Sequence, residues 1–161
     1  MRAPRLAAAS LTLSAAALVG IALSEGWEPV ARPPVAGDVA TGGFGSTRIE
    51  SGAPMPPGER VHPIRALVLL QRDAGAAERT VRRCAPVPMH QHEFDAFVSL
   101  TYNIGGNAFC RSTLVRKLVA GDYPGACAEI LRWDQFHGRR LPGLAARRER
   151  EYRQCMGEGA E

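Results

Sequence analysis

No two of the four cysteines in this 161-residue chain stand in a Cys-x-x-Cys arrangement, which argues against a zinc ribbon. Charged residues are only 22% of the chain and hydrophobic residues reach 45%, so the body is not a disordered polyelectrolyte. We find no internal repeat. What is present is enough apolar sequence for one compact domain preceded by a leader.

The leader is a long stretch without charge. Arg2 and Arg5 precede an uncharged run, residues 6–23, that is rich in Ala, Leu, Ser and Gly. As a single helix at about 1.5 Å per residue, this run would span roughly 27 Å, close to the ~30 Å hydrocarbon core of a bilayer. The arginines would hold the amino terminus in the cytoplasm and send the remainder outward. We therefore expect an N-terminal hydrophobic helix that exports the protein.

The sequence leaves two fates open for this leader. The triplet Ala15-Ala16-Ala17 offers a small-residue site of the kind at which signal peptides are cleaved. Against cleavage, the many small residues make the run only weakly apolar, and Glu25 follows it with only Ser24 between.

Four cysteines follow the leader, and an even number in an exported protein implies disulfides, with three possible pairings. We favour Cys110 with Cys127, because the loop between them is short. The remaining pair, Cys84 with Cys155, would then join the ends of two helices. Spatial distance decides pairing, and the sequence does not contain it.

The formal net charge of +4 and a pI near 9.2 favour an anionic partner. Charge alone does not distinguish nucleic acid, an anionic membrane, an acidic cell-wall polymer and a merely basic solvated surface. Cys84 with His90 and His92 has the chemistry of a metal site. Two histidines that flank Gln91 near a helix start are more often surface residues, so we expect neither a metal nor another cofactor.

The pattern of residues changes from turns to helices along the chain. Pro and Gly are dense over residues 27–58, which suits turns and short strands, with a small antiparallel hairpin of residues 39–41 and 46–50. From Pro63 onward, apolar residues recur every three or four positions. We expect an α+β fold with a small β-hairpin lobe and a mainly helical lobe, with Ser112 as an N-cap and Pro142 as a first helical residue. The expected helices cover residues 63–84, 94–104, 114–120, the region around 127–131, and 142–155.

Glu25, Asp38 and Thr41 lie around the glycine-rich segment 41–47. An ionised carboxylate is costly in apolar surroundings, so an acid beside the leader needs a reason, and donating a proton is one. A carboxylic acid with a second carboxylate that positions water is the apparatus of glycoside hydrolysis. Taken alone, such a trio is more often a surface cluster.

Four motifs accompany this trio in a fixed order. They are Glu25-Gly26-Trp27 with Thr41 and Phe44-Gly45-Ser46-Thr47; Gln91-x-x-Phe94-Asp95-Ala96 with Asn103-x-Gly105; Ser112-Thr113-Leu114 with Ala120-Gly121-Asp122-Tyr123; and Trp133 with Leu141-Pro142-Gly143-Leu144, Arg147-Arg148 and Glu151. In this order they resemble the phage-type lysozymes of glycoside hydrolase family 24, and they cover nearly everything after the leader. The resemblance implies a lysozyme-like fold. It also implies an endolysin that hydrolyses, for host cell lysis, the β-1,4 bond between N-acetylmuramic acid and N-acetylglucosamine in peptidoglycan, with inversion.

The resemblance also implies roles for individual residues. Glu25 would be the general acid that protonates the leaving oxygen, and Thr41 would help to hold the attacking water. One position departs from the family pattern, because Pro34 stands where the usual aspartate falls. Asp38 is the nearest replacement, and we assign it the water-activating role. The alternative is that Asp38 only closes the turn through its backbone.

Substrate contacts are implied on the helical part. Asn103 would line a sugar cleft, or else terminate a helix beside glycine. Arg148 and its neighbour Arg147 would touch substrate, or else pair with Glu151 on a solvated helix. Residues expected only as core are Phe94, Phe97, Leu114 and Leu118.

The leader resembles the signal-arrest-release segments of some phage endolysins, which tether the enzyme in the inner membrane and then escape to the periplasm. We accordingly divide the chain into a signal-arrest-release or signal-anchor segment (residues 1–23), a lysozyme-like catalytic domain (24–156) and a tail (157–161). The expected partners are peptidoglycan and, before release, the inner membrane. We expect a monomer that does not bind nucleic acid.

Two readings from other classes remain. A non-catalytic peptidoglycan-binding module is indicated by Pro34, which carries no acid. A membrane-anchored structural protein held by disulfides is indicated by the leader and the cysteines alone. Muramidase activity on purified cell walls separates all three.

Overall fold

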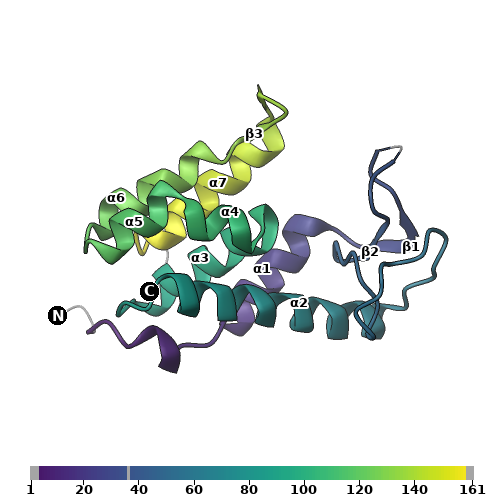
Figure 1. Cartoon of the computed structure of the whole chain (residues 1–161), viewed down its shortest axis with the longest axis horizontal. Helices are drawn as coiled ribbons and strands as arrows, with labels where there is room; N and C mark the ends of the chain where they lie inside the picture. The colour runs from purple at the N-terminus through teal and green to yellow at the C-terminus, as the bar shows by residue number, and fades with distance from the viewer. Residues whose placement is uncertain (1–3, 36, 159–161) are drawn as a thin grey trace. The chain divides into compact units, whose positions relative to one another are not determined.

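The computed structural model describes residues 4–35 and 37–158 (Figure 1). Residues up to Ala17 and from Ala76 onward form one compact unit, here unit 1, and Leu18–Gly75 form unit 2. The elements, in chain order, are the 3-10 helix η1 (Ala8–Ser10), α1 (Ala15–Glu25), β1 (Glu28–Arg32), β2 (Thr41–Gly43), α2 (Pro63–Cys84), α3 (Gln91–Ile104), α4 (Gly106–Arg111), α5 (Thr113–Val119), α6 (Tyr123–Glu129), η2 (Ile130–Arg132), β3 (Gln135–Phe136), β4 (Arg139–Arg140) and α7 (Pro142–Cys155).

Unit 1 is helical and is built around one apolar core. Helix α3 packs against α7, and α5 packs against α6 (Figure 1). The expected core residues Phe94, Phe97, Leu114 and Leu118 are all fully buried, as is Phe109, which the motifs did not single out. Burying each of these large side chains contributes about 1.5–3 kcal/mol, so this cluster is the main source of stability in unit 1.

The expected helices form, and local chemistry sets their ends. Helix α2 has the predicted bounds, and α3 stops before Gly105, whose φ of 86° suits glycine. Ser112 caps α5, because its hydroxyl accepts a hydrogen bond from the Val115 N–H at 3.2 Å. Pro142 opens α7 as predicted. Helix α4 was not predicted, because the pair Gly105-Gly106 looked only like a stop.

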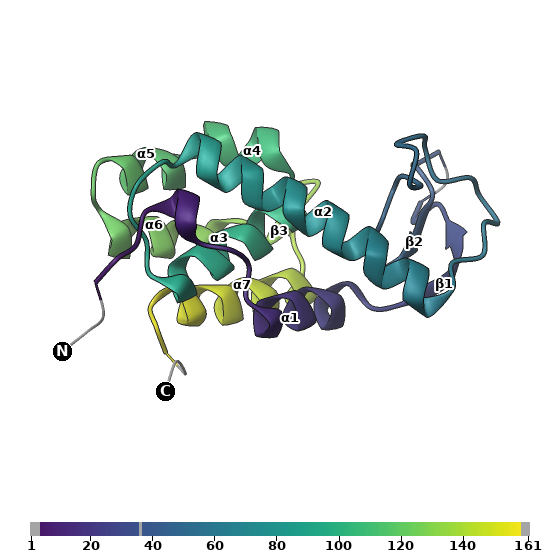
Figure 2. The same cartoon turned by 90° about the horizontal axis from the view of Figure 1, so that it is seen from below.

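The leader does not form the single helix expected over residues 6–23. Leu6 exchanges two backbone hydrogen bonds with Met89, both 2.8 Å long, and a helix begins only at Ala15. Ala8 and Leu11 lie buried in the core of unit 1. Figure 2 shows this stretch as the purple N-terminal trace. None of the helices in the described part of the chain is both long enough and apolar enough to cross a bilayer.

Side chains of unit 1 explain why the leader is not helical between η1 and α1. The Leu13 N–H donates to Glu78 Oε1 at 2.8 Å, and the Ser14 N–H donates to Asp95 Oδ1 at 3.0 Å. These carboxylates satisfy amides that a continuous helix would have used internally. Tertiary hydrogen bonds therefore override the helical propensity of the alanine-rich run.

Unit 2 contains the small antiparallel sheet, but its strands differ from the predicted ones. Strand β1 pairs with β2, with Glu28 opposite Gly43 and Arg32 opposite Thr41. The hairpin expected over 39–41 and 46–50 was wrong, because β1 lies in a segment that its prolines had marked as turns. Proline is tolerated at a sheet edge, where its missing N–H is not needed. The buried core of this unit consists of Ala31, Ala40, Met55, Val61, Ala66 and Leu69.

Both disulfides lie in unit 1, and the expected pairing was wrong. The bonds join Cys84 to Cys110 and Cys127 to Cys155, with Cα–Cα distances of 5.4 and 5.7 Å. Sequence separation misled the prediction, because the end of α2 lies beside α4, and the middle of α6 lies beside the end of α7. Each bond thus joins two helices that pack together in the folded unit.

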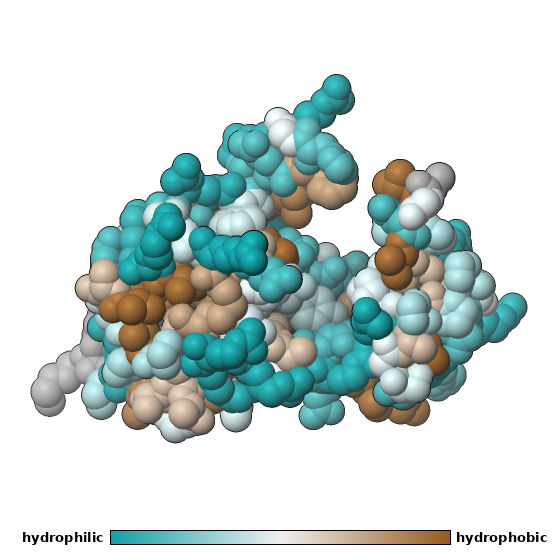
Figure 3. Space-filling view, viewed as in Figure 1, coloured by the Kyte–Doolittle hydropathy of each residue, from teal (hydrophilic) through white to brown (hydrophobic). Residues whose placement is uncertain are grey.

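Hydrophobic side chains also reach the surface of each unit, as the brown atoms in Figure 3 show. In unit 2, the first turns of α2 expose Ile64, Leu67 and Val68. In unit 1, the β3–β4 hairpin exposes Phe136 against His137, with ring centroids 4.2 Å apart. This second hairpin was not predicted, since its strands are only two residues long.

Candidate active site

Glu25 is the last residue of α1, and Gly26 ends that helix. Gly26 has a φ of +72°, which glycine adopts without a steric penalty, and its N–H donates to the Ala22 carbonyl at 3.0 Å. The Glu-Gly pair therefore stops the helix at the acid. The Glu25 side chain is partly buried at this position.

The glycine-rich motif forms a tight turn beside this acid. Gly42 and Ser46 exchange two backbone hydrogen bonds, each 3.0 Å long. Gly45 has a φ of +83°, and a Cβ atom placed there would lie 3.0 Å from Glu25 Oε2. Only a residue without a side chain lets the turn and the carboxylate come this close. Unit 2 thus brings Glu25 against the glycine-rich turn.

Thr41 and Asp38 lie in the same unit as Glu25. Thr41 opens β2, and its hydroxyl lies 3.5 Å from the Arg32 carbonyl oxygen. Asp38 is exposed in the β1–β2 connection, and its backbone N–H donates to the Val35 carbonyl at 3.0 Å. That bond is the turn-closing role expected as the alternative, and it leaves the carboxylate open to solvent. Pro34 is exposed in the same connection.

A polar network that no sequence motif marks holds the glycine-rich turn. Asp73 of α2 accepts a hydrogen bond from the Ser46 hydroxyl at 2.7 Å. Arg72 binds the other oxygen of Asp73, with Nε 2.8 Å from Oδ1. Ser46 belongs to a motif that the sequence had singled out, but nothing in a helical pattern marks Asp73 as its partner.

Asn103 and Arg148 lie together in unit 1. Arg148 is fully buried and donates from Nη1 to Asn103 Oδ1 at 3.1 Å, whereas Asn103 is exposed. Arg148 Nε lies 2.7 Å from Glu151 Oε2, and Arg147 Nε and the Ser99 hydroxyl donate to Oε1 at 3.1 and 2.7 Å. The pairing with Glu151 is as expected. The prediction that this helix face is solvated was wrong, because Ser99, Arg147, Arg148 and Glu151 are all buried. A buried charge is stable only when it is paired and hydrogen-bonded in this way.

The residues weighed as a metal site do not form one. Cys84 is bonded to Cys110 and therefore offers no thiolate. His90 and His92 stack on each other with ring centroids 5.2 Å apart. Across residues 4–35 and 37–158, no group of three or more His, Cys, Asp or Glu side chains has the geometry to hold a metal ion.

Comparison with known proteins agrees with the fold. The family model "Phage lysozyme" matches residues 22–151. An endolysin of Acyrthosiphon pisum secondary endosymbiont phage 1 is 39% identical over 98 residues, which cover 58% of this chain and 67% of the relative. The SAR-endolysin of Enterobacteria phage P21 is 36% identical over 88 residues, covering 55% of this chain and 53% of that protein. These alignments span about half to two thirds of the relatives.

Solved structures are similar over more of the chain. The endolysin from Escherichia coli O157:H7 phage FAHEc1 gives a TM-score of 0.80 at 31% identity, covering 91% of this chain and 94% of that one. The muramidase domain of SpmX from Asticaccaulis excentricus gives a TM-score of 0.79 at 27% identity, covering 91% and 98%. The matched segment contains Glu25, the glycine-rich turn and the Arg148 cluster together. The chain therefore belongs to the phage lysozyme family, whose enzymes lyse peptidoglycan.

Proposed function

We propose that this chain cleaves the β-1,4 bond between N-acetylmuramic acid and N-acetylglucosamine, with Glu25 as the general acid. The observation that carries the proposal is the contact of the Glu25 carboxylate with the turn at Gly45. In its protonated form Glu25 donates its proton to the glycosidic oxygen as the bond to the sugar breaks. At Gly45 the turn itself places no side chain against the carboxylate.

The attacking water is assigned to Thr41 and Asp38. The Thr41 hydroxyl accepts and donates hydrogen bonds, and it begins the strand that leads into the glycine-rich turn. The Asp38 carboxylate makes no hydrogen bond within the described residues, so it is available to accept a proton from water. An inverting mechanism needs such a base on the face opposite the acid.

Substrate binding is assigned to Asn103, supported by Arg148. The buried guanidinium holds Asn103 Oδ1, which fixes the amide and directs its NH₂ group outward. An exposed amide of fixed orientation suits the hydroxyl and acetamido groups of a sugar. Arg148 itself is too buried for direct contact and acts through Asn103.

The products test this function directly. Purified peptidoglycan digested by the enzyme should give fragments whose reducing ends are N-acetylmuramic acid, which borohydride reduction and mass spectrometry identify. A non-catalytic peptidoglycan-binding module is the alternative indicated by Pro34, which carries no acid. Such a module would sediment with the polymer and release no fragments. Fragments with N-acetylglucosamine at the reducing end would contradict the proposed bond.

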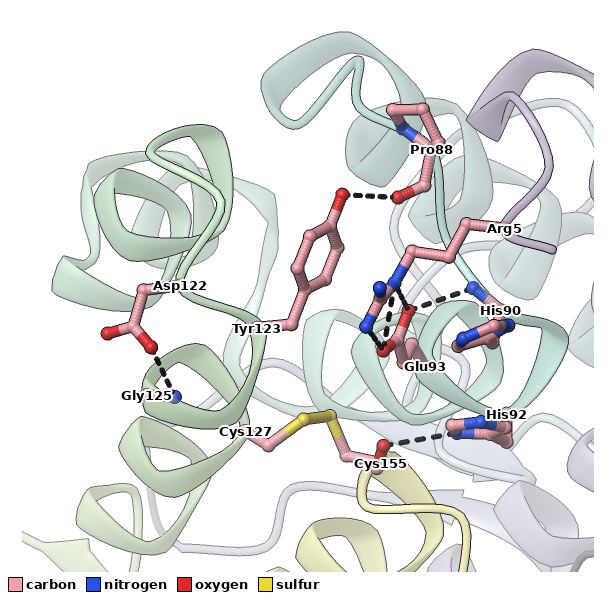
Figure 4. Close-up of polar contacts among 10 residues, drawn as sticks. All are labelled: Arg5, Pro88, His90, His92, Glu93, Asp122, Tyr123, Gly125, Cys127 and Cys155. Atoms are coloured by element: carbon pink, nitrogen blue, oxygen red, sulfur yellow. Dashed lines mark hydrogen bonds and ion pairs between the residues drawn. A yellow bond between two sulfur atoms is a disulfide. The ribbon is translucent and has the colours of Figure 1, made fainter. Parts of the chain in front are cut away.

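We further propose that residues 1–23 act as a signal-arrest-release segment ahead of a catalytic domain of residues 24–156 and a short tail, 157–161, and that the monomeric enzyme works in the periplasm. Contacts of Arg5 support a released state (Figure 4). Its Nη2 lies 2.7 Å from Glu93 Oε1, its Nε lies 3.0 Å from Oε2, and its guanidinium carbon lies 3.7 Å from the centroid of the Tyr123 ring. The hydrogen bond to Glu93 raises the pKa of Arg5.

This pairing links membrane release to folding. Glu93 is buried, and Arg5 is the cation that pairs with it among the described residues. While the leader spans the membrane, Arg5 is held on the cytoplasmic side, and Glu93 keeps the hydrogen bond from the His90 N–H but lacks its cation. A buried carboxylate without its cation destabilises the fold. Release therefore completes unit 1.

Fractionation of cells before and after collapse of the membrane potential should move the wild-type protein from the membrane to the periplasm. Glu93→Gln should also be released, but its free energy of unfolding should be lower by about 2 kcal/mol, because the charged hydrogen bonds to Arg5 are lost. The matched control is Glu149→Gln, which removes an exposed pair with Arg153 and should change stability by no more than about 0.5 kcal/mol. Permanent membrane retention, or equal stabilities for the two variants, would contradict the proposal.

A further inference from the structure

Asp73 lies on α2 at the place where that helix meets the glycine-rich turn of unit 2. Its Oδ2 accepts the Ser46 hydroxyl at 2.7 Å, and Ser46 is almost fully buried, with 1% of its surface exposed. A buried hydroxyl without a partner costs about 1–3 kcal/mol, so this bond fixes the side chain of Ser46 firmly. The backbone of Ser46 is already tied to Gly42 by two hydrogen bonds. Asp73 therefore holds the closing residue of the turn.

Arg72 holds the chain that follows the turn. Its Nη1 donates to the Ile49 carbonyl at 2.6 Å, and its Nη2 donates to the Arg48 carbonyl at 3.0 Å. Its Nε binds Asp73 at 2.8 Å, so the guanidinium is fixed on both sides. Two consecutive residues of one helix thus anchor residues 46–49. We call Arg72 and Asp73 the α2 clamp.

The same turn lies close to Glu25 at Gly45. The site for a Cβ on Gly45, one residue before Ser46, lies 3.0 Å from Glu25 Oε2. At Gly43 the site for a Cβ lies 2.9 Å from the Cβ of Ala66 on α2, so the turn has no room to move toward the helix. A displacement of Ser46 must therefore change the distance between the turn and the Glu25 carboxylate.

We propose that Asp73 is a positioning residue for the reaction: by accepting the Ser46 hydroxyl, it holds the glycine-rich turn at the distance from Glu25 that proton donation requires. The inference rests on the proposed role of Glu25. An error of about 1 Å in the placement of a reacting group costs up to about 10²-fold in rate, so the clamp acts on kcat. Asp73 makes no contact with the substrate in this scheme, and KM should not change.

Ser46→Ala removes the hydrogen bond and leaves the pair of Asp73 with Arg72 intact. We expect kcat on purified peptidoglycan to fall about tenfold with KM unchanged, and Ser46→Thr, which keeps the hydroxyl, to restore most of the rate. Asp73→Asn keeps the size of the side chain but removes its negative charge, so either an amide NH₂ group or a neutral oxygen faces Arg72. This variant should lower kcat at least as much as Ser46→Ala does. Thermal unfolding of each variant, measured alongside, ensures that rates are compared below the melting temperature.

The matched control is Glu50→Gln. Glu50 also carries an ion pair in unit 2, with Arg65 at 2.7 Å, and that hydrogen bond lowers the pKa of Glu50 to about 2, so the pair is charged at neutral pH. It does not contact the turn, and kcat should stay at the wild-type value. A wild-type kcat in folded Ser46→Ala, or an equal loss in Glu50→Gln, would overturn the positioning role. A wild-type protein that hydrolyses nothing would instead overturn the proposed function.

Discussion

Glu25→Gln is expected to lower the rate of peptidoglycan hydrolysis by about 10²–10⁴-fold and to leave binding to the polymer intact. Glutamine has nearly the same size and fits beside the turn at Gly45, but it has no acidic proton to give to the leaving oxygen. Reducing sugar released from purified cell walls measures the rate, and cosedimentation with the same walls measures binding.

Asp38→Asn serves as the comparison within the same unit. If Asp38 activates water, its variant should lose activity nearly as strongly as Glu25→Gln. If it only closes the turn, its backbone N–H still reaches Val35 and activity should persist. Unchanged hydrolysis by Glu25→Gln would remove the mechanism altogether, whatever Asp38 does.

Loss of the Cys127–Cys155 bond is expected to lower the free energy of unfolding by about 3–4 kcal/mol, since it closes a long loop in the unfolded chain. The two residues are 28 positions apart, and the bond joins α6 to α7. For a chain of this size the melting temperature should fall by roughly 10 °C. Calorimetry of the Cys127→Ser/Cys155→Ser double variant checks this value. A reducing agent, which breaks both bonds, should lower the melting temperature further.

Trypsin distinguishes the observed pairing from the one that the sequence favoured. Cleavage after Arg83 and Arg111 leaves Cys84 and Cys110 in one peptide, so their bond appears as an internal loop. Residues 118–132 should then be linked to the C-terminal peptide that begins at Gln154. The alternative pairing would join all three peptides in a single species, and detection of that species would contradict the structure.

The helices of unit 1 could be predicted because their signals are local. Phe94 and Phe97 share the face that packs into the core, Ser112 supplies the cap of α5, and Pro142 fits the first turn of α7. Each signal acts within one or two turns of helix. Tertiary contacts then reinforce a preference that the segment already has.

The leader and the disulfides could not be predicted because distant residues decide them. Met89, Glu78 and Asp95 bind the leader's backbone from positions far along the chain, and no local pattern announces them. Cysteine pairing depends on which helix ends meet in space. The strands of unit 2 were predicted wrongly for a related reason, because β1 is stabilised by its pairing with Thr41 and Gly43.

The candidate site was partly accessible from the sequence. The Glu25-Gly26 pair and the glycine-rich segment were recognisable as motifs, and the contact at Gly45 follows from the conformations that glycine allows. The α2 clamp was not, because Asp73 lies in a regular helix with an ordinary composition. The burial of Arg148 was also missed, since its partner Glu151 looked like an exposed neighbour.

The seating of Ala8 and Leu11 in the interior bears on proteolytic processing. A peptidase that cut after Ala17 would remove both residues and would cut α1 in its first turn. The apolar residues that now cover Ala8 and Leu11 would become exposed to solvent. The acids at positions 78 and 95 would also lose the amides they now hold. In the folded enzyme, then, the N-terminal segment forms part of the interior of the helical unit, and its removal would destabilise the protein.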